Sequence, residues 1–490
     1  MGLDQPPVTG IDLDALGRDD SWEGVRALVA GFGVSGFAAA DTLTHLGAAV
    51  IAVDASEGDA ARREQAVLLR ILGADVRLGP GATDTLPDDI DVVVTSPGWR
   101  PDTPLLAEAA ERGIPIWGEV ELAWRLRGPD AAPWLAVTGT NGKTTTVQML
   151  EQILLAAGLR ARAVGNVGTP VLEAVMDPEG YDVLAVELSS FQLHWISSMS
   201  AEAAAVLNIA PDHYDWHGGA DAYATAKGRV YENVQRACVY NVADPMTRRL
   251  VEDADVIEGA RAIGFTRGVP GLSELGVVDD LLADRAFVEN RAEQAAELGS
   301  LDDLYDDAPH VIENALAAAA LARAHGVEPA AVRAGLRAFR PGPHRVAEVG
   351  RIGGIRYVDD SKATNPHAAA AALSAVESAV WIAGGLAKGA TFDDLVAGAR
   401  DRLRAVVLIG RDRALIAEAL ARHAPEVPVV EVETSEDDLM DRVVEVASSF
   451  AGDGDTVLLA PACASMDQFT DYAQRGESFA EAVRRLADRT

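Results

Sequence analysis

The sequence has few cysteines, few aromatic residues and no long apolar run. Its 490 residues include two cysteines, Cys238 and Cys463, and 5% aromatic side chains. Two cysteines cannot build a disulfide framework, which indicates a reducing compartment. Apolar stretches such as residues 317–322 are too short to cross a bilayer, and the first ten residues lack the basic region and apolar core of a signal peptide. We therefore expect a cytoplasmic protein without a membrane span.

Basic side chains are also scarce relative to acidic ones. The chain has 42 Lys and Arg against 75 Asp and Glu, a formal net charge of −33. Such a surface repels nucleic-acid phosphate, so nucleic acid is excluded as a partner. Any phosphate-binding site must be local and built from backbone N–H groups and a few cations. With 49% apolar and 24% charged residues the chain is globular, and its length suggests about three domains.

Short β-rich segments alternate with Ala- and Leu-rich helical segments along most of the chain, a pattern typical of βαβ units and parallel sheets. A linker marked by Pro and Gly near residues 128–133 and a break at residues 340–343 divide this pattern. We predict an α/β protein with a flexible leader over 1–20 and three domains over 21–130, 131–341 and 342–490. The acidic stretch 266–306 is expected to form loops.

The segment 138–145, TGTNGKTT, is typical of a phosphate-binding loop. It lies between an apolar strand and a helix that begins near Thr144. Glycines allow a tight turn whose N–H groups face phosphate oxygens, while Lys143 would reach the outer phosphates and Thr144 a Mg²⁺ ion. The alternative is a helix-initiating turn with an exposed lysine. The strand before the loop and the helix after it favour an ATP site.

Candidate metal ligands follow later strands. Glu187 ends the strand 181–187, where a carboxylate suits hydrated Mg²⁺, although an acid there can also cap a helix. Asn208 and His213 follow the next strand within a polar cluster. Lys227 lies in a helical stretch, where a solvated lysine is the alternative.

A second glycine-rich turn lies in the first domain. Gly31, Gly33 and Gly36 follow a strand and open a helix, and Asp54 ends the next strand. This pattern fits a dinucleotide or any other diphosphate. The alternative is an NAD-dependent dehydrogenase. A simple dehydrogenase has no use for the Gly-Lys-Thr loop, and we therefore prefer a nucleotide-diphosphate ligand.

Six motifs occur in the order found in the Mur ligases, and the resemblance covers about residues 25–485. They are TGTNGKTT (138–145), GNVGTP (165–170), ELSSFQL (187–193), LNIAPDH (207–213), DDSKATN (359–365) and PACASMDQF (461–469). The chain resembles this family, and above all its D-glutamate-adding members.

The resemblance implies an N-terminal Rossmann-like nucleotide-sugar domain, a central P-loop-type ATPase domain and a C-terminal Rossmann-like domain that binds the amino acid. It further implies an ATP-dependent amide ligase that joins D-glutamate to UDP-N-acetylmuramoyl-L-alanine through an acyl phosphate, in cytoplasmic peptidoglycan precursor synthesis. The protein is expected to use two Mg²⁺ ions and to be a monomer.

The same resemblance assigns roles to individual residues. The ATP site comprises Gly139, Thr140, Asn141, Gly142, Lys143, Thr144, Thr145, His310, Asn314 and Arg345. The metal ligands are Thr144, Glu187, His213 and a carbamylated Lys227, and Lys143 joins the last three as the catalytic set. The UDP-substrate residues are Val34, Ser35, Asp54, Gly98, Asn166 and His213. The D-glutamate residues are Lys362, Thr364, Lys388, Ser465 and Tyr472.

Two alternatives stay open. A folylpolyglutamate synthase-like ligase would share the fold, but the turn at Gly31–Gly36 with Asp54 argues for a UDP-sugar substrate. A catalytically silent binding protein is the other, and the joint presence of Lys143, Glu187, His213 and Lys227 argues against it.

Overall fold

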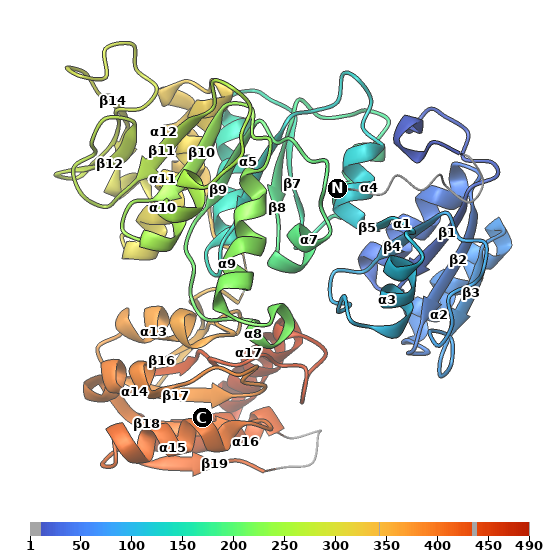
Figure 1. Ribbon diagram of the computed structural model, residues 1–490. Helices are drawn as coiled ribbons and strands as arrows, with labels where there is room; N and C mark the ends of the chain where they lie inside the picture. The colour runs from blue at the N-terminus through green and yellow to red at the C-terminus, as the bar shows by residue number, and fades with distance from the viewer. Residues whose placement is uncertain (1–10, 343, 434–438, 490) are drawn as a thin grey trace. The chain divides into compact units, whose positions relative to one another are not determined.

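The computed structural model describes residues 11–342, 344–433 and 439–489, which form two compact units. One unit extends to Phe339 apart from Ala210–Ala220, and the second unites Ala210–Ala220 with the chain from Arg340 onward. Three α/β sheets, two in the first unit and one in the second, confirm the predicted fold class (Figure 1).

The part of the predicted flexible leader that the structure describes, residues 11–20, is folded against the first domain. Residues 1–10 lie outside the described residues, but η1 (Leu13–Ala15) follows them and Leu13 is buried in the first unit's core. Arg18 Nη1 donates a hydrogen bond of 2.7 Å to the carbonyl of Val175. Residues 11–20 are thus packed against the domain, because an apolar side chain and a guanidinium anchor them.

The first sheet is parallel, with strand order β3-β2-β1-β4-β5. Its elements are β1 (Arg26–Ala30), β2 (Ala49–Asp54), β3 (Asp75–Leu78), β4 (Val92–Thr95), β5 (Ile116–Gly118), α1 (Val34–His45), α2 (Ala60–Leu72), α3 (Pro104–Glu111) and α4 (Glu119–Arg125). The strand order reverses at β1, so the loops that follow β1 and its neighbours lie where parallel α/β sheets bind ligands.

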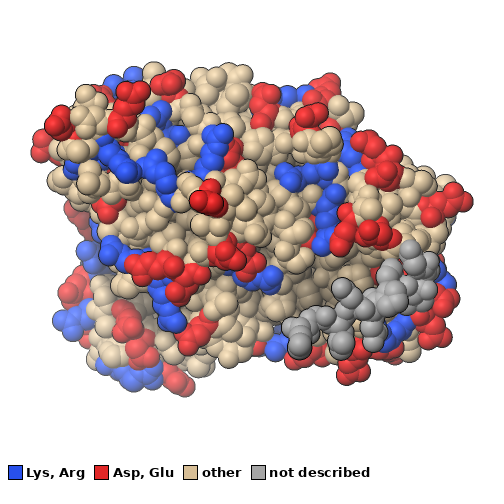
Figure 2. Space-filling view, turned by 45° about the horizontal axis from the view of Figure 1, so that its top comes forward, with Lys and Arg blue, Asp and Glu red and all other residues tan. Residues whose placement is uncertain are grey.

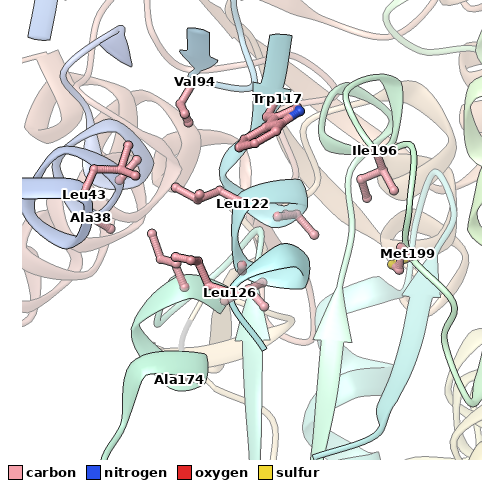
Figure 3. Packing of buried hydrophobic residues seen from close by; sticks show 14 of the residues in the cluster. Ala38, Leu43, Val94, Trp117, Leu122, Leu126, Ala174, Ile196 and Met199 are labelled. Atoms are coloured by element: carbon pink, nitrogen blue, oxygen red, sulfur yellow. The ribbon is translucent and has the colours of Figure 1, made fainter. Parts of the chain in front are cut away.

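Helix α4 joins the cores of the first and second sheets. Leu122 of α4 and Leu126, which directly follows the helix, belong to a buried cluster that also contains Leu43 of α1 and Ile196 and Met199 of the central domain. In Figure 3, Leu43 lies on one side of Leu122 and Leu126, and Ile196 and Met199 lie on the other. The two sheets of the first unit therefore share one continuous core.

The central sheet has nine strands in the order β14-β13-β12-β11-β10-β9-β6-β8-β7. Its strands are β6 (Trp134–Thr138), β7 (Ala161–Gly165), β8 (Val183–Glu187), β9 (Ala203–Val206), β10 (Ala237–Asn241), β11 (Arg261–Phe265), β12 (Glu274–Val278), β13 (Leu281–Asp284) and β14 (Ala296–Ser300). Its helices are α5 (Lys143–Ala156), α6 (Val171–Met176), α7 (Ser190–His194), α9 (Ala220–Gly228), η2 (Arg229–Tyr231), α10 (Pro245–Glu252), η3 (Leu301–Asp303), α11 (Pro309–His325) and α12 (Pro329–Ala338). Apolar residues of α5, α11 and α12 cover one face of this sheet.

The expectation that 266–306 forms loops is wrong. The stretch contributes β12, β13 and β14, which extend the central sheet in antiparallel pairs. Leu275, Leu282 and Leu298 of these strands are fully buried. Asp279 adopts a left-handed conformation (φ 56°) in the two-residue turn between β12 and β13, a geometry that Asp tolerates. Acidic residues in turns and at strand ends concealed three short strands.

The C-terminal sheet has the order β15-β16-β20-β17-β18-β19, with β15 antiparallel to its neighbour. Its strands are β15 (Ala347–Ile352), β16 (Ile355–Asp359), β17 (Ala379–Gly384), β18 (Leu403–Ile409), β19 (Val429–Glu431) and β20 (Thr456–Leu459). The helices of this unit are α8 (Tyr214–His217), α13 (Pro366–Ser374), α14 (Asp393–Ala399), η4 (Arg400–Arg402), α15 (Arg413–His423), α16 (Leu439–Phe450) and α17 (Tyr472–Arg489). Helices α13, α14 and α15 cover one face, and α16 and α17 the other.

Charged side chains of both signs are interspersed on the molecular face shown in Figure 2. No helix among the described residues is long and apolar enough to cross a bilayer.

Candidate functional site

The loop after β6 is closed by hydrogen bonds to the loop after β9. Thr140 N–H donates to the carbonyl of Asn208 (3.0 Å), and Asn141 N–H donates to Asn208 Oδ1 (2.9 Å). Asn208 Nδ2 donates back to the carbonyl of Asn141 (3.1 Å). Asn208, which sequence reasoning left without a role, therefore fixes the predicted phosphate loop from a neighbouring strand.

The loop leads directly into α5, whose first residue is Lys143. Lys143 Nζ donates to the carbonyls of Gly139 (2.9 Å) and Thr140 (3.0 Å), so the ammonium folds back over the loop. Thr144 and Thr145 are buried in the first turn of the helix. N–H groups at a helix start beside a lysine form a site suited to phosphate.

Asn314 of α11 lies against the same loop. Gly142 has a φ of 84°, and a Cβ added there would lie 2.3 Å from Asn314 Oδ1. Glycine is thus required both by the backbone and by the neighbouring amide. His310 lies one turn earlier on α11. The structure thus brings Asn314 to the loop, and its contact with ATP stays a prediction.

Glu187 ends β8, the strand that pairs with β6. One carboxylate oxygen, Oε1, accepts a hydrogen bond of 2.9 Å from Asn166 Nδ2. The other, Oε2, is buried and has no hydrogen-bond partner within the described part of the chain. Ser189 rather than Glu187 caps α7, in a capping box with Gln192. An unpartnered carboxylate oxygen beside a phosphate loop fits a Mg²⁺ ligand.

Lys227 is buried rather than solvated, with 2% of its surface exposed. Its Nζ donates to the carbonyl of Gly139 (2.9 Å) and lies 3.5 Å from Thr138 Oγ1. The ammonium also lies 4.8 Å from the centre of the Tyr223 ring. Tyr223, which sequence reasoning missed, also bonds Thr140 Oγ1 through its hydroxyl (3.0 Å). Its place one helical turn before Lys227 is the signal that could have found it.

The predicted UDP-substrate residues lie at the carboxyl edge of the first sheet. Asp54 accepts hydrogen bonds from Phe32 N–H (2.7 Å) and Ser56 N–H (2.8 Å), which joins the loops after β1 and β2. A Cβ on Gly36 would lie 1.9 Å from the carbonyl oxygen of Gly31, so this glycine lets α1 pack against the turn. Val34 and Ser35 open α1, with Val34 69% exposed. The glycine pattern therefore forms the turn that the sequence predicts. Gly98 follows β4 at the same edge, and Asn166 instead contacts Glu187.

His213 and Arg345 belong to the second unit. His213 precedes α8 with a left-handed backbone (φ 52°), and its Nε2 lies 3.5 Å from Asp212 Oδ2. Arg345 lies between His344 and Val346, both of which also have positive φ values. Non-glycine residues rarely adopt this conformation, and where they do they often cluster at functional sites.

The predicted D-glutamate residues lie on loops at one edge of the C-terminal sheet. Lys362 and Thr364 follow β16, Lys388 follows β17, Ser465 follows β20, and Tyr472 begins α17. Lys362 Nζ lies 3.8 Å from the centre of the Tyr472 ring, a cation–π contact. Ala462 N–H donates to the carbonyl of Ala363 (2.9 Å), which joins the loops after β16 and β20.

Comparisons with known proteins identify the family. The Mur ligase middle domain matches residues 137–270, and the Mur ligase glutamate ligase domain matches residues 344–463. A UDP-N-acetylmuramoylalanine–D-glutamate ligase of Streptomyces avermitilis is 62% identical over 467 residues, which span 95% of this chain and 99% of that protein. The chain belongs to the Mur ligase family. The resemblance inferred from its six motifs is confirmed.

A further relative by sequence and two solved structures with the same fold are similar to this Mur ligase. The UDP-N-acetylmuramoylalanine–D-glutamate ligase of Mycolicibacterium smegmatis is 45% identical over 515 aligned positions, covering 98% of this chain and 99% of that protein. UDP-N-acetylmuramate-alanine ligase of Thermotoga maritima shares the fold with a TM-score of 0.57 at 20% identity, over 94% of this chain and 99% of its own. MurF of Acinetobacter baumannii does so with a TM-score of 0.58 at 17% identity, over 89% and 91%. The dehydrogenase alternative is therefore not supported.

Proposed function

We propose that this Mur ligase joins D-glutamate to UDP-N-acetylmuramoyl-L-alanine at the expense of ATP, as a step in peptidoglycan precursor synthesis. The observation that carries the proposal is 62% identity over nearly full length to a ligase named for this reaction. The phosphate loop, Lys143 and the half-satisfied Glu187 supply chemistry that such a ligase needs.

The reaction must first activate a carboxylate, because its resonance-stabilised oxygen leaves poorly. Attack of the carboxylate oxygen on the γ-phosphorus of ATP forms an acyl phosphate and breaks the bond to ADP. The amine of D-glutamate then attacks the acyl carbon, loses a proton, and expels inorganic phosphate. Lys143 and the N–H groups that open α5 would hold the phosphates and spread their charge.

Mg²⁺ fits the donors present. Thr144, Glu187, His213 and Lys227 are the proposed ligands for two ions, and the metal would neutralise phosphate charge during transfer. A carbamate on Lys227 would turn its buried cation into a carboxylate ligand. The carbamate nitrogen retains one hydrogen, which could still donate to the carbonyl of Gly139, now 2.9 Å from Nζ.

The remaining assignments are part of the same proposal. Val34, Ser35, Asp54, Gly98, Asn166 and His213 would contact the uridine nucleotide, and Lys362, Thr364, Lys388, Ser465 and Tyr472 would contact D-glutamate. His310, Asn314 and Arg345 would contact ATP. Domain boundaries at 130/131 and 341/342, a monomeric state and a cytoplasmic location stay predictions.

An assay of phosphate release from ATP tests the substrate assignment. The purified protein with UDP-N-acetylmuramoyl-L-alanine should release phosphate with D-glutamate and far less with L-glutamate, L-lysine or D-aspartate. Release with L-glutamate and a pterin substrate, but none with the muramoyl nucleotide, would instead support the folylpolyglutamate synthase alternative.

A further inference from the structure

The largest buried cation of the second unit is Arg475 on α17, with none of its surface exposed. Its Nε donates to Ser361 Oγ (2.9 Å) and its Nη2 to the carbonyl of Ser361 (2.8 Å). Its Nη1 donates to the carbonyl of Cys463 (3.1 Å). Burial lowers the pKa of Arg475 to about 10, so the side chain stays cationic at neutral pH.

Burying the Arg475 guanidinium costs free energy of folding, so stability alone does not explain why an arginine occupies this position. Within the described part of the chain, the guanidinium of Arg475 donates its hydrogen bonds to a hydroxyl and two carbonyls and forms no direct ion pair. The charges of Asp467 and Asp359 oppose its desolvation only in part, because burial still lowers its pKa. Buried ionic groups can often be replaced by apolar side chains of similar volume without loss of stability. Its three hydrogen bonds go instead to two loops, which points to a role in fixing their geometry.

Those loops carry most of the proposed D-glutamate residues. Ser361 directly precedes Lys362, and Cys463 lies two residues before Ser465. Ser361 Oγ donates to the carbonyl of Tyr472 (2.8 Å), the residue whose ring faces Lys362 Nζ. Arg475 therefore ties the loop after β16, the loop after β20 and the start of α17 into one network.

The next residue extends the same network. A Cβ on Gly476 would lie 2.2 Å from His344 Nδ1 and 2.6 Å from Asp359 Oδ2, two atoms that are themselves 2.6 Å apart. Only glycine leaves room for this pair. Lys362 N–H in turn donates to the carbonyl of His344 (3.3 Å). The Arg475–Gly476 turn thus packs against the groups on either side of Lys362.

We propose that Arg475 is a positioning residue for D-glutamate, which acts by holding Lys362, Ser465 and Tyr472 in one arrangement. This inference rests on the proposed function. Loss of the guanidinium should impair docking of the dicarboxylate and leave acyl-phosphate formation intact, since that step needs no amino acid.

The test compares Arg475→Lys and Arg475→Met with wild type. Arg485→Met serves as the control, because Arg485 is an exposed residue of the same helix whose partners are Asp441 and Glu481. For each variant, the KM values for D-glutamate, ATP and the muramoyl nucleotide are measured, together with thermal unfolding. Hydroxylamine, which traps acyl phosphates as hydroxamates, reports the first step in the absence of D-glutamate.

We expect KM for D-glutamate to rise about tenfold or more in both Arg475 variants, equivalent to ~1.4 kcal/mol. The KM values for ATP and the muramoyl nucleotide, and the rate of hydroxamate formation, should change by less than about twofold. If Arg475→Met does not fold, Ser361→Ala tests the same network, since it removes the hydroxyl between Arg475 and Tyr472.

Equal changes in all three KM values, or a loss of thermal stability with an unchanged KM for D-glutamate, would overturn the inference. Failure of the proposed function is distinguishable, because wild type itself would then form neither hydroxamate nor a D-glutamate product.

Discussion

All four lysines of this chain, Lys143, Lys227, Lys362 and Lys388, are candidate site residues, whereas its other side chains that are cationic at neutral pH are arginines. Lysine and arginine differ in chemistry. An amine can lose its proton and react with CO₂, whereas a guanidinium stays protonated at neutral pH. This division supports specific chemical roles for the lysines, and it makes them few enough to follow individually.

Replacement of Lys227 tests the carbamate. Lys227→Ala should lower kcat about a hundredfold or more, as expected when the charge on a metal site is disturbed, and added short carboxylates such as formate should restore part of it. Lys227→Arg, which keeps a cation but cannot form a stable carbamate, should also be inactive.

With ¹³C-labelled bicarbonate, wild type should give a carbamate NMR signal that Lys227→Ala lacks. Normal turnover of the Lys227→Ala variant would contradict the carbamate proposal.

Among the helices, α5 combines a sharp entry turn with a phosphate-binding end. Gly142→Ala should raise KM for ATP about tenfold, because the new Cβ would displace Asn314 from the loop. Gly158→Ala is the matched control. It also has a positive φ, 80°, at the other end of α5, but its Cβ would meet nothing within 4 Å.

Both variants should lose about 1 kcal/mol of stability from backbone strain, which urea unfolding would measure. Only the variant at 142 should change the affinity for ATP, and an equal rise in KM for both would show that strain alone is responsible.

The elements that sequence reasoning located are those with a continuous apolar pattern. The β-rich segments 25–31, 49–55 and 91–98 contain β1, β2 and β4, and they stand out in the sequence because buried parallel strands consist almost wholly of apolar residues. Strands β12 to β14 were missed because they are short, and glycines and acidic residues interrupt their pattern.

The parts of the site that come from a single motif could be predicted from the sequence. The contacts between segments that are distant in sequence could not. The loop at 138–145 could be read directly, but its bonds to Asn208 and its contact with Tyr223 depend on β9 and α9 lying beside it. Arg475 reaches Ser361 across 114 positions of sequence, a contact that no local pattern indicates.

For the molecule as a whole, two buried carboxylates on α4 join the first sheet to the central domain. Glu121 accepts hydrogen bonds from the N–H and hydroxyl groups of Ser197 and Ser198. Burial opposes its ionisation, but these bonds together lower its pKa. Glu119 accepts a hydrogen bond from Leu172 N–H (2.6 Å), and the backbone of Val171 also favours its charged form. Burial outweighs both and raises its pKa to about 7, with Glu173 adding to the effect.

Glu119 should make stability depend on pH. Its pKa is higher in the folded state than the ordinary 4.5, so the folded protein holds this proton more tightly and loses stability as pH rises from about 4.5 to about 7. Glu119→Gln, whose amide oxygen can still accept the bond from Leu172, should therefore stabilise the protein at pH 8 by about 3 kcal/mol. It should have little effect at pH 4.5.

Urea unfolding at the two pH values measures this difference, with Glu64→Gln on the exposed side of α2 as control. A gain from Glu119→Gln that is equal at both pH values would contradict the assignment.

Cys238 and Cys463 are both buried, and burial raises the pKa of each thiol to about 12. Neither forms a reactive thiolate at neutral pH while its surroundings stay closed. Cys238 lies in the first unit and Cys463 in the second, so each unit contains one buried thiol that an alkylating reagent can reach only when the unit opens. The rate of alkylation at each cysteine, followed by peptide mapping, would therefore measure the opening of each unit separately in the natural sequence.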